Sequence, residues 1–312
     1  MPKPLTIDFR NLWGGFFKHD NLITNTLSLE YDVSVDEQNP DIVVCQVCPK
    51  SHGAPDPQSF THGLKGKSKV IYWLVESIDR TGNPDYSSCD FSFSSCEYDD
   101  DRNVRVPLWS MYVNWFGDKQ ESYVPDRNQA FLVSPDKLLQ SRKHSEKNKF
   151  CCILTNNDMG MRKEVYPAFV NLGIENGLLV ESRGRYLTNM PPIANDEKNK
   201  LDYIDAFKFN LCYDNGEASG WVTEKLIHPI YQGSIPIYWG CNNVASEFNE
   251  ERFIHARNFD NLGSMWEKIM ELNYNKDKFL EMQSQPCFPN NSIPDCASPE
   301  FLVEKFKRIV EA

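Results

Sequence analysis

Short apolar runs recur along the chain, and within each run the apolar residues follow one another with little polar alternation. In the first half such runs cover residues 6–9, 41–48 and 69–75, and the last of these is β-branched and aromatic throughout. Uninterrupted apolar runs are typical of strands that are covered on both faces, as in parallel α/β sheets. The first half is therefore predicted to hold a parallel sheet.

The second half restarts this pattern after a polar stretch. The predicted strands are residues 150–155, 177–182, 207–214 and 234–240, and a helix is predicted over residues 162–172. Between the last two strands, apolar residues recur at helical spacing from Val222 to Gln232, and Gly233 follows where a helix commonly stops. Strand, helix and strand in that order form a βαβ unit, which predicts a second parallel sheet.

The length of 312 residues is too great for one ordinary core and suits two domains. The polar stretch from Lys137 to Lys149 is interpreted as a solvated connection, which gives an N-terminal domain over 1–143 and a C-terminal domain over 144–297. Residues 298–312 are predicted to form a helix that packs back on the first domain. Ser298 would cap this helix, Pro299 would begin it, and its apolar face would hold Phe301, Leu302, Phe306, Ile309 and Val310.

Two halves of this kind resemble the GT-B architecture. The predicted fold class is therefore α/β, with two Rossmann-like, doubly wound domains that face each other across a cleft. In such folds ligands bind at the carboxyl ends of the strands.

Composition and charge narrow the possible partners. Hydrophobic residues make up 40% of the chain and charged residues 25%, as in ordinary globular proteins. The net charge of -11 argues against a nucleic-acid partner, because a phosphate-binding surface shows as clustered Lys and Arg. No run approaches the ~18–20 apolar residues of a membrane span, and the N-terminus lacks the pattern of a signal peptide. The expected location is the cytoplasm, unless an anchor lies outside this sequence.

Cysteine and acidic clusters give weak evidence for metal chemistry. Cys45 and Cys48 form a lone CxxC without a second pair, which is more often plain structure than a zinc or redox site. Whether Cys287 and Cys296 pair is left open. The acidic run 99–101 has the form of a DxD metal motif, but it follows no convincing nucleotide-binding strand. No metal site is predicted.

The segment from residue 209 to residue 240 is the most informative part of the chain. A strand ends at about Asp214, and a loop rich in Gly and Ser leads into a helix that begins near Thr223. The free N–H groups and the dipole of a helix N-terminus attract anions, and Lys225 in the first turn is favourable if a phosphate lies in front of it. Glu224 can accept hydrogen bonds from sugar hydroxyls, and Asn215 and Trp221 can bracket a nucleoside. The alternative is a surface loop and helix with a chance Glu-Lys pair.

This segment also resembles the hallmark of a known family. FNLCYDN (209–215), GWVTEK (220–225) and IPIYWG (235–240) resemble the motifs of the α-1,3/4-fucosyltransferases, glycosyltransferase family 10. Two positions differ, since Asp214 stands where the family usually has Glu and Trp221 where it has Tyr. The resemblance extends over nearly the whole chain, including KVIYWLVES (69–77) and NNDMGMRKEVYPAF (156–169).

The resemblance implies an inverting enzyme that moves L-fucose from GDP-β-L-fucose to an oligosaccharide acceptor. The expected acceptor group is the 3-hydroxyl of N-acetylglucosamine in a lactosamine-type glycan, with the 4-hydroxyl as the alternative. The resemblance places the catalytic carboxylate on Glu76 and the pyrophosphate contact on Arg162. It completes the donor site with Asn215, Trp221, Thr223, Glu224 and Lys225. No cofactor is expected, and a divalent metal is expected to be dispensable.

Several assignments have plainer alternatives. Glu76 could simply begin a polar loop, and Arg162 could pair with Glu164 or Asp158. Trp13 and Phe16 could contact acceptor sugar or belong to the core. For the whole chain, the rival hypotheses are a transferase for another nucleotide sugar such as GDP-mannose, an inactive sugar- or nucleotide-binding protein, and an interaction scaffold. The absence of the family's heptad-repeat tails favours a monomer.

Overall fold

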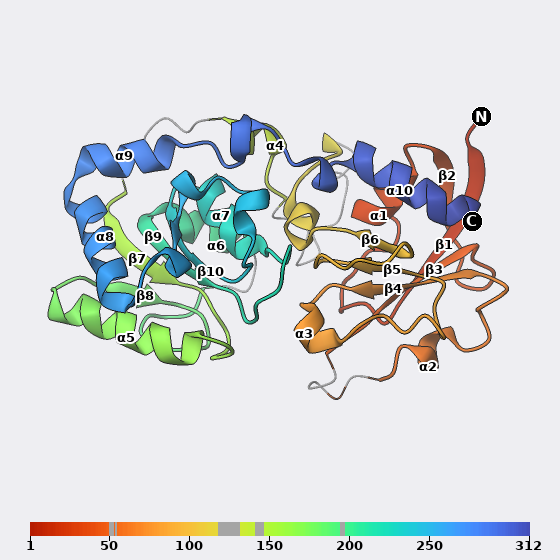
Figure 1. Cartoon of the computed structure of the whole chain (residues 1–312), viewed down its shortest axis with the longest axis horizontal. Helices are drawn as coiled ribbons and strands as arrows, with labels where there is room; N and C mark the ends of the chain where they lie inside the picture. Colours follow the sequence, from red (N-terminus) through yellow and green to blue (C-terminus); the bar gives the residue numbers. More distant parts are fainter. Residues whose placement is uncertain (50–52, 54, 118–131, 141–146, 194–196) are drawn as a thin grey trace. The chain divides into compact units, whose positions relative to one another are not determined.

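The computed structural model of the chain describes residues 1–49, 53, 55–117, 132–140, 147–193 and 197–312. The chain divides into two compact units (Figure 1). Unit 1 comprises residues 1–129, 218–221 and 293–312, and unit 2 comprises residues 130–217 and 222–292. The domain boundary predicted between residues 143 and 144 falls on 141–146, outside the described residues.

Among the residues that the structure describes, unit 1 is built on a six-stranded parallel sheet with the order β2-β1-β3-β4-β5-β6. Its strands are β1 (Lys3–Arg10), β2 (Tyr31–Val35), β3 (Ile42–Gln46), β4 (Lys69–Leu74), β5 (Phe91–Ser94) and β6 (Asn103–Arg105). The strands predicted over 6–9, 41–48 and 69–75 are confirmed as β1, β3 and β4.

Side chains of the unit 1 strands alternate between two apolar cores, as the pleat of a strand requires. In β4, Ile71 and Trp73 pack into one core, while Val70 and Tyr72 pack into the other. The first core is covered by α1 (Leu22–Leu27) and α10 (Pro299–Glu311), and the second lies on the side of α2 (Gln58–Thr61). The short helix α3 (Ile78–Thr81) follows β4.

The C-terminal helix packs on unit 1, as predicted. Ser298 caps it by accepting a hydrogen bond from the backbone N–H of Phe301, and Pro299 is its first residue. The Phe306 ring lies 4.8 Å from the Phe93 ring, centroid to centroid. The prediction that Phe301 belongs to the apolar face is wrong, because its side chain is exposed.

Unit 2 is built on a second parallel sheet, which has five strands in the described residues and the order β11-β10-β9-β7-β8. Its strands are β7 (Lys149–Ile153), β8 (Val180–Ser182), β9 (Phe207–Tyr213), β10 (Ile235–Trp239) and β11 (Ile254–His255). The four strands predicted for the second half are confirmed as β7 to β10. The two-residue β11 was not predicted, because so short a strand shows no recognisable pattern.

The helices of unit 2 are α4 (Pro135–Leu139), α5 (Arg162–Glu175), α6 (Glu197–Asp205), α7 (Glu224–Tyr231), α8 (Leu262–Tyr274) and α9 (Lys276–Ser284). Helices α5 and α8 pack on one face of the sheet through Phe169 and Trp266. Helix α7 connects β9 to its parallel neighbour β10 and ends before Gly233, which has a φ of +73°. This arrangement confirms the predicted βαβ unit.

The connection predicted over Lys137 to Lys149 includes helical and buried residues on both sides of 141–146, which lie outside the described residues. Residues 135–139 form α4, and the buried Lys147 donates hydrogen bonds to the Asp205 carboxylate and to the Gln232 carbonyl. The interpretation of this whole stretch as solvated was therefore wrong. A lysine can be buried when its ammonium group has this many acceptors.

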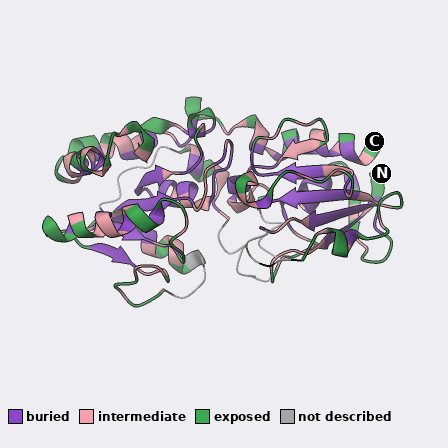
Figure 2. Cartoon of the chain, turned by 60° about the horizontal axis from the view of Figure 1, so that its bottom comes forward, coloured by how far each residue is buried: buried purple, intermediate pink, exposed green. Residues whose placement is uncertain are grey.

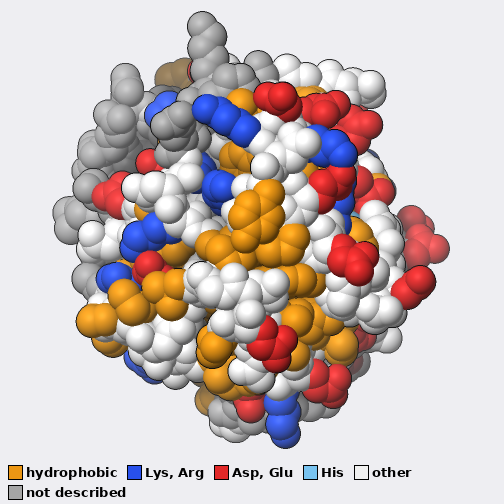
Figure 3. Space-filling model, turned by 90° about the vertical axis from the view of Figure 1, so that its left-hand side faces the viewer, with side chains coloured by type: hydrophobic (Ala, Val, Ile, Leu, Met, Phe, Trp, Pro, Cys, Tyr) orange, Lys and Arg blue, Asp and Glu red, His pale blue; other side chains and the backbone are white. Residues whose placement is uncertain are grey.

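Most strands of the two sheets are buried, and the helices that cover them are exposed on their outer sides. Figure 2 shows buried strands in each sheet and helices whose outer sides are exposed. Figure 3 shows apolar side chains gathered on the side where Figure 1 draws α5, α8 and α9. Large exposed hydrophobic residues of unit 2 include Ile174, Leu179 and Tyr274. No helix in the described part of the chain combines the length and the apolar character of a membrane span.

Candidate active site

The strand order of unit 2 predicts where a ligand would bind. After β7 the chain builds β8 on one side and then crosses to build β9 on the other. In open parallel sheets, ligands bind outside the carboxyl ends of the strands at such a switch in direction. A cavity of about 650 Å³ lies there, lined by residues that follow β7, β8 and β9 and by the first turn of α7.

The cavity is strongly basic. Among the described residues, its charged lining consists of five basic side chains, Arg162, Arg183, Arg185, Lys200 and Lys225, and one acidic side chain, Glu224. Arg162, Lys225, Glu224 and Asn215 are four of the residues predicted for the donor site. A cavity with this excess of positive charge suits an anionic ligand.

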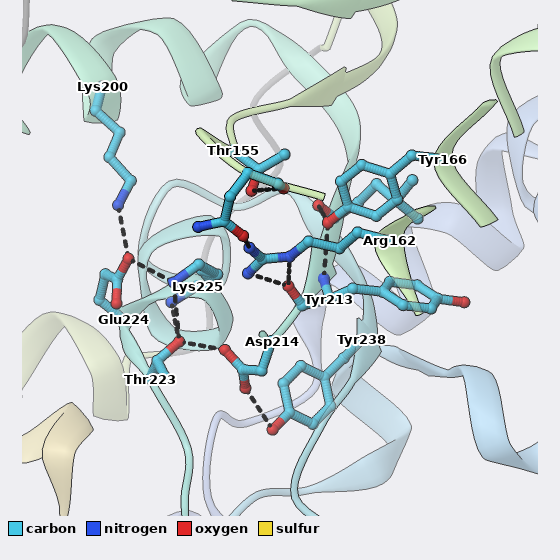
Figure 4. A network of polar contacts seen from close by, with 12 residues as sticks. Thr155, Arg162, Tyr166, Lys200, Tyr213, Asp214, Thr223, Glu224, Lys225 and Tyr238 are labelled. Atoms are coloured by element: carbon cyan, nitrogen blue, oxygen red, sulfur yellow. Dashed lines mark hydrogen bonds and ion pairs between the residues drawn. The ribbon is translucent and has the colours of Figure 1, made fainter. Parts of the chain in front are cut away.

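Arg162 is the first residue of α5 and is buried to 2% exposure. Its Nε and Nη2 donate hydrogen bonds of 2.9 and 2.7 Å to the carbonyl oxygen of Tyr213 (Figure 4). Its Nη1 donates one of 2.6 Å to Asn157 Oδ1. The predicted alternative partners were Glu164 and Asp158, but the guanidinium is held instead by a neutral carbonyl and a neutral amide. Its positive charge is therefore not cancelled by these partners.

Glu224 lies between two lysines. Its Oε1 accepts hydrogen bonds from Lys225 Nζ at 3.1 Å and from Lys200 Nζ at 3.2 Å. Burial alone would raise the pKa of this carboxyl, but the two ammonium groups outweigh burial and hold the pKa well below its usual range. Glu224 is thus an ionised acceptor, which fits hydrogen bonding to hydroxyl groups better than proton transfer.

Arg183, Arg185 and Lys200 were not identified from the sequence. The two arginines follow β8 in the segment ESRGRY, and Lys200 belongs to α6. Gly184, between the arginines, lets the backbone after β8 pack directly against Thr155. A Cβ at this position would lie 2.0 Å from the Thr155 carbonyl oxygen. The signal that could have identified the two arginines is their position directly after a predicted strand of a doubly wound domain, where ligands bind.

A buried network supports the start of α7. Thr223 is the N-cap residue, and its hydroxyl oxygen accepts from the backbone N–H of Lys225 at 3.3 Å. The same hydroxyl donates to Asp214 Oδ1 at 2.6 Å, and Tyr238 donates to Asp214 Oδ2 at 3.0 Å (Figure 4). Thr223 was predicted as a donor contact, but the structure places it behind the cavity lining, where it holds Lys225.

Trp221, which was predicted for the donor site, is not among the residues that line this cavity. It groups with unit 1, where it is 1% exposed and packs with Cys96, Leu108 and Ala218. Its Nε1 donates a hydrogen bond of 3.2 Å to the carbonyl oxygen of Val75, the residue before Glu76. The indole therefore braces the backbone beside the predicted catalytic carboxylate.

In unit 1, Glu76 follows the carboxyl end of β4. Its side chain is 32% exposed, and its Oε2 accepts a hydrogen bond of 2.7 Å from Arg80 Nη1, one turn later in the chain. Glu76 lies in the short loop between β4 and α3, so this ion pair is compatible with a catalytic carboxylate and with a residue that begins a polar loop. Its catalytic role stays a prediction.

Trp13 and Phe16 follow β1 in the same unit, and both are partly buried against its core. Their rings lie 5.0 Å apart in an edge-to-face arrangement, and the Trp13 ring lies 5.9 Å from that of Trp73. Part of each side chain packs against the core of unit 1, and the role of both residues in binding the acceptor stays a prediction.

The structure adds no support for a metal site at the acidic run 99–101 or at Cys45 and Cys48, or for a disulfide between Cys287 and Cys296. In the residues that the structure describes, no group of three or more His, Cys, Asp or Glu side chains is placed to hold a metal ion. Within the acidic run 99–101, Asp100 binds the Arg102 guanidinium at 3.1 Å. In the part of the chain that the structure describes, Cys45, Cys48, Cys287 and Cys296 do not form disulfide bonds.

Sequence comparisons identify relatives of the chain. Residues 144–284 match the family described as glycosyltransferase family 10 (fucosyltransferase) C-term. Over 308 residues the chain is 28% identical to the alpha-(1,3)-fucosyltransferase FucT of Helicobacter pylori, with 90% of this chain and 60% of that protein covered. It is also 22% identical over 138 residues to 4-galactosyl-N-acetylglucosaminide 3-alpha-L-fucosyltransferase 9 of Mus musculus, with 44% and 36% covered. The chain thus spans about three-fifths of the length of the bacterial relative.

Solved structures show the same architecture. A crystal structure of an alpha1,3-fucosyltransferase matches with a TM-score of 0.74 at 23% identity, covering 100% of this chain and 91% of that one. A crystal structure of an alpha1,3-fucosyltransferase with GDP-fucose matches with a TM-score of 0.70 at 23% identity, covering 100% and 92%. Together with the two parallel sheets, these matches confirm the predicted α/β fold class of GT-B type with two doubly wound units.

Proposed function

Over residues 144–284 this chain belongs to glycosyltransferase family 10, and from this premise we propose that it transfers L-fucose from GDP-β-L-fucose to a sugar hydroxyl with inversion at the anomeric carbon. The observation that carries the proposal is the basic cavity at the strand switch point of unit 2, with Arg162, Lys225 and Asn215 in its lining. The names of the relatives, an alpha-(1,3)-fucosyltransferase among them, support the choice of donor.

Transfer breaks the bond between the anomeric carbon and a diphosphate, so negative charge develops on the departing GDP. Fixed positive groups at that point stabilise the transition state more than the ground state. Lys225, Arg162 and the N-terminus of α7 supply this charge in the proposal. Glu224, kept ionised by Lys225 and Lys200, accepts hydrogen bonds from hydroxyls of the donor. Asn215 completes the donor contacts.

An acceptor hydroxyl must lose its proton as it attacks. Glu76 is the proposed general base, a role that typically contributes ~10²–10⁴-fold to the rate. Its carboxylate is part exposed and hydrogen-bonded by Arg80, so it is accessible and oriented. Attack on the face opposite the leaving diphosphate converts the β-linked donor to an α-fucoside.

The proposed acceptor is N-acetylglucosamine in a lactosamine-type glycan, modified at the 3-hydroxyl, with the 4-hydroxyl as the alternative. The name of the mouse relative, a 4-galactosyl-N-acetylglucosaminide 3-alpha-L-fucosyltransferase, supports the 3-hydroxyl. Trp13 and Phe16 are the proposed aromatic surface for the acceptor, since aromatic faces suit the C–H surfaces of sugars. The proposal requires no cofactor and no divalent metal.

The test is to incubate the protein with GDP-fucose and each of the two lactosamine isomers and to determine the product linkage by NMR. The expected product is an α-1,3-fucoside of the isomer whose 3-hydroxyl is free. A parallel assay with GDP-mannose separates the rival donor. Tight GDP binding without turnover of any donor would favour the inactive binding protein instead and would overturn the proposal.

A further inference from the structure

The start of α7 depends on a single buried carboxylate. Asp214 follows β9 directly, is 0% exposed, and lies behind the cavity lining rather than in it. Its two oxygens accept one hydrogen bond each from neighbouring hydroxyls, from Thr223 at 2.6 Å and from Tyr238 at 3.0 Å. A side chain so enclosed is fixed by these partners.

The direction of each hydrogen bond follows from the available donors. The Tyr238 oxygen accepts from the backbone N–H of Cys241 at 2.9 Å, so its proton points to Asp214. The Thr223 oxygen faces two donors on Lys225, the backbone N–H at 3.3 Å and Nζ at 3.5 Å. A hydroxyl has one proton and two lone pairs. When the Thr223 proton goes to Asp214, both lone pairs are free for Lys225.

We propose that Asp214 is a positioning residue for donor binding: its carboxylate turns the Thr223 hydroxyl so that this hydroxyl accepts both hydrogen bonds from Lys225. The inference rests on the proposed function, in which Lys225 contacts the donor diphosphate. Asp214 itself touches neither donor nor reacting atoms. It acts through Thr223.

The network is complete only when Asp214 is ionised. A proton on Oδ1 would occupy one lone pair of the Thr223 oxygen, and the Thr223 proton would then have to turn toward Lys225, which offers only donors. A proton on Oδ2 would reverse the bond to Tyr238, whose oxygen would then accept from both Asp214 and Cys241, and the Tyr238 proton would lose Asp214 as its acceptor. Protonation therefore removes one hydrogen bond from the network in either form, and it makes Asp214 a weaker, neutral acceptor for the Thr223 proton.

Gly240 packs directly against the hydrogen bond between Asp214 and Tyr238. A Cβ on Gly240 would lie 2.6 Å from Asp214 Oδ2 and 2.7 Å from the Tyr238 hydroxyl oxygen. The glycine at the end of IPIYWG is thus required by this hydrogen bond. Displacing the carboxylate would also displace the cap of α7.

The ionisation of Asp214 responds to pH near neutrality. Burial raises its pKa to about 6, against the opposing effects of Lys225 and of the hydrogen bond from Thr223. Four neighbouring groups have pKa values shifted away from this range. Burial raises the pKa of Tyr238 and of Cys212 well above their usual values, and the two lysines hold that of Glu224 well below its own. His228, beyond Glu224, has its pKa lowered by burial and stays neutral.

The expected consequence is a loss of donor affinity on acidification. With a pKa of about 6, only about a tenth of Asp214 is ionised at pH 5, and the neutral form is expected to bind GDP about tenfold more weakly. The Kd of GDP, measured by calorimetry, should therefore rise about fivefold from pH 7.5 to pH 5. The terminal phosphate of GDP also titrates near pH ~6, so the pH dependence must be compared with that of a variant.

The decisive variant is Asp214→Asn, with the exposed Asp277→Asn as the matched control. Asp214→Asn should bind GDP about tenfold more weakly at pH 7.5, as expected for a lost charged hydrogen bond, and should retain only the pH dependence of the ligand. Asp277→Asn should match the wild type at every pH. Wild-type affinity and pH dependence in Asp214→Asn would overturn the inference.

Variants at Thr223 keep the test valid if Asp214→Asn fails to fold. Thr223→Ser retains the hydroxyl and should preserve both affinity and pH dependence. Thr223→Val removes the hydroxyl, so it should weaken GDP binding and abolish the contribution of Asp214. Equal Kd values for the Ser and Val variants would refute the relay. A wild-type protein that binds no GDP would instead overturn the proposed function, so the two failures are distinguishable.

Discussion

Two glutamates follow parallel strands in the two units, Glu76 after β4 of unit 1 and Glu224 at the start of α7, the helix after β9 of unit 2. Their surroundings differ. Glu224 is enclosed by two lysines and is held ionised, while Glu76 pairs with Arg80 and has a side chain that is 32% exposed. The first environment suits a fixed acceptor of hydrogen bonds, and the second leaves a carboxylate accessible for its proposed role as general base. The same residue type on the same architecture is thus assigned different chemistry by its neighbours.

The sharpest test of this comparison is Glu76→Gln. The amide keeps the shape of the side chain but cannot accept a proton, so transfer to an acceptor should fall by about 10³-fold, within the range of general-base catalysis. The affinity for GDP should stay within about twofold of wild type, because the proposed donor site is built from unit 2. Initial rates with GDP-fucose and lactosamine, together with calorimetry of GDP, measure both quantities.

The exposed Asp79→Asn in the first turn of α3 is the control for Glu76→Gln. It removes a nearby carboxylate without touching the proposed base, so it should keep near-normal turnover. Near-normal turnover in Glu76→Gln would refute the assignment of the base.

The contrast between the two glutamates was only partly predictable from sequence. The strand over 69–75 and the helix after GWVTEK have clear patterns, and the matched motifs then pointed to Glu76, Glu224 and Lys225. Neither Arg80 nor Lys200 belongs to a matched motif. Their contacts with the two glutamates depend on a helical turn in one case and on the packing of α6 beside α7 in the other.

Other features depended on tertiary structure in the same way. Arg183 and Arg185 reach the cavity because β8 lies at the edge next to β7, and a pattern of residues does not fix which strand neighbours which. Trp221 follows a glycine-rich loop and could serve a ligand or a core by its chemistry alone. Only the fold shows that it packs under the backbone of Val75 in unit 1.

A smaller but still large effect is expected at Lys225. Lys225→Ala removes a positive charge from the cavity and releases Glu224 Oε1 from one partner. The ratio kcat/KM for GDP-fucose should fall by about 10²-fold, with both kcat and KM affected, because the proposed contact acts in binding and in the departure of GDP. The exposed Lys163→Ala on α5 is the control. A change confined to KM would mean that Lys225 only binds the donor.

Lys200 should contribute less, because it acts through Glu224. Lys200→Met removes an ammonium 3.2 Å from Glu224 Oε1 but leaves Lys225 in place. The KM for GDP-fucose should rise about tenfold, while kcat changes little. Lys200→Arg should recover most of the affinity, and the exposed Lys163→Met should resemble wild type. A fall in kcat as large as that of Lys225→Ala would instead place Lys200 at the reacting phosphates.

The smallest effect is expected from removing divalent metal. Positive charge for the departing diphosphate comes, in the proposal, from Lys225, Arg162 and the N-terminus of α7, which are parts of the protein and do not dissociate. The transfer rate in EDTA should therefore stay within about twofold of the rate with added Mg²⁺ or Mn²⁺, since each charge that the reaction needs is already fixed in place. A tenfold or larger loss of transfer rate in EDTA that added Mn²⁺ restores would show that Lys225, Arg162 and the N-terminus of α7 are insufficient.

The same assay is more sensitive in Lys225→Ala, because this variant lacks one of the fixed charges. A metal that restores the rate of this variant alone would be replacing the lysine. A metal that also accelerates the wild type would belong to the normal reaction.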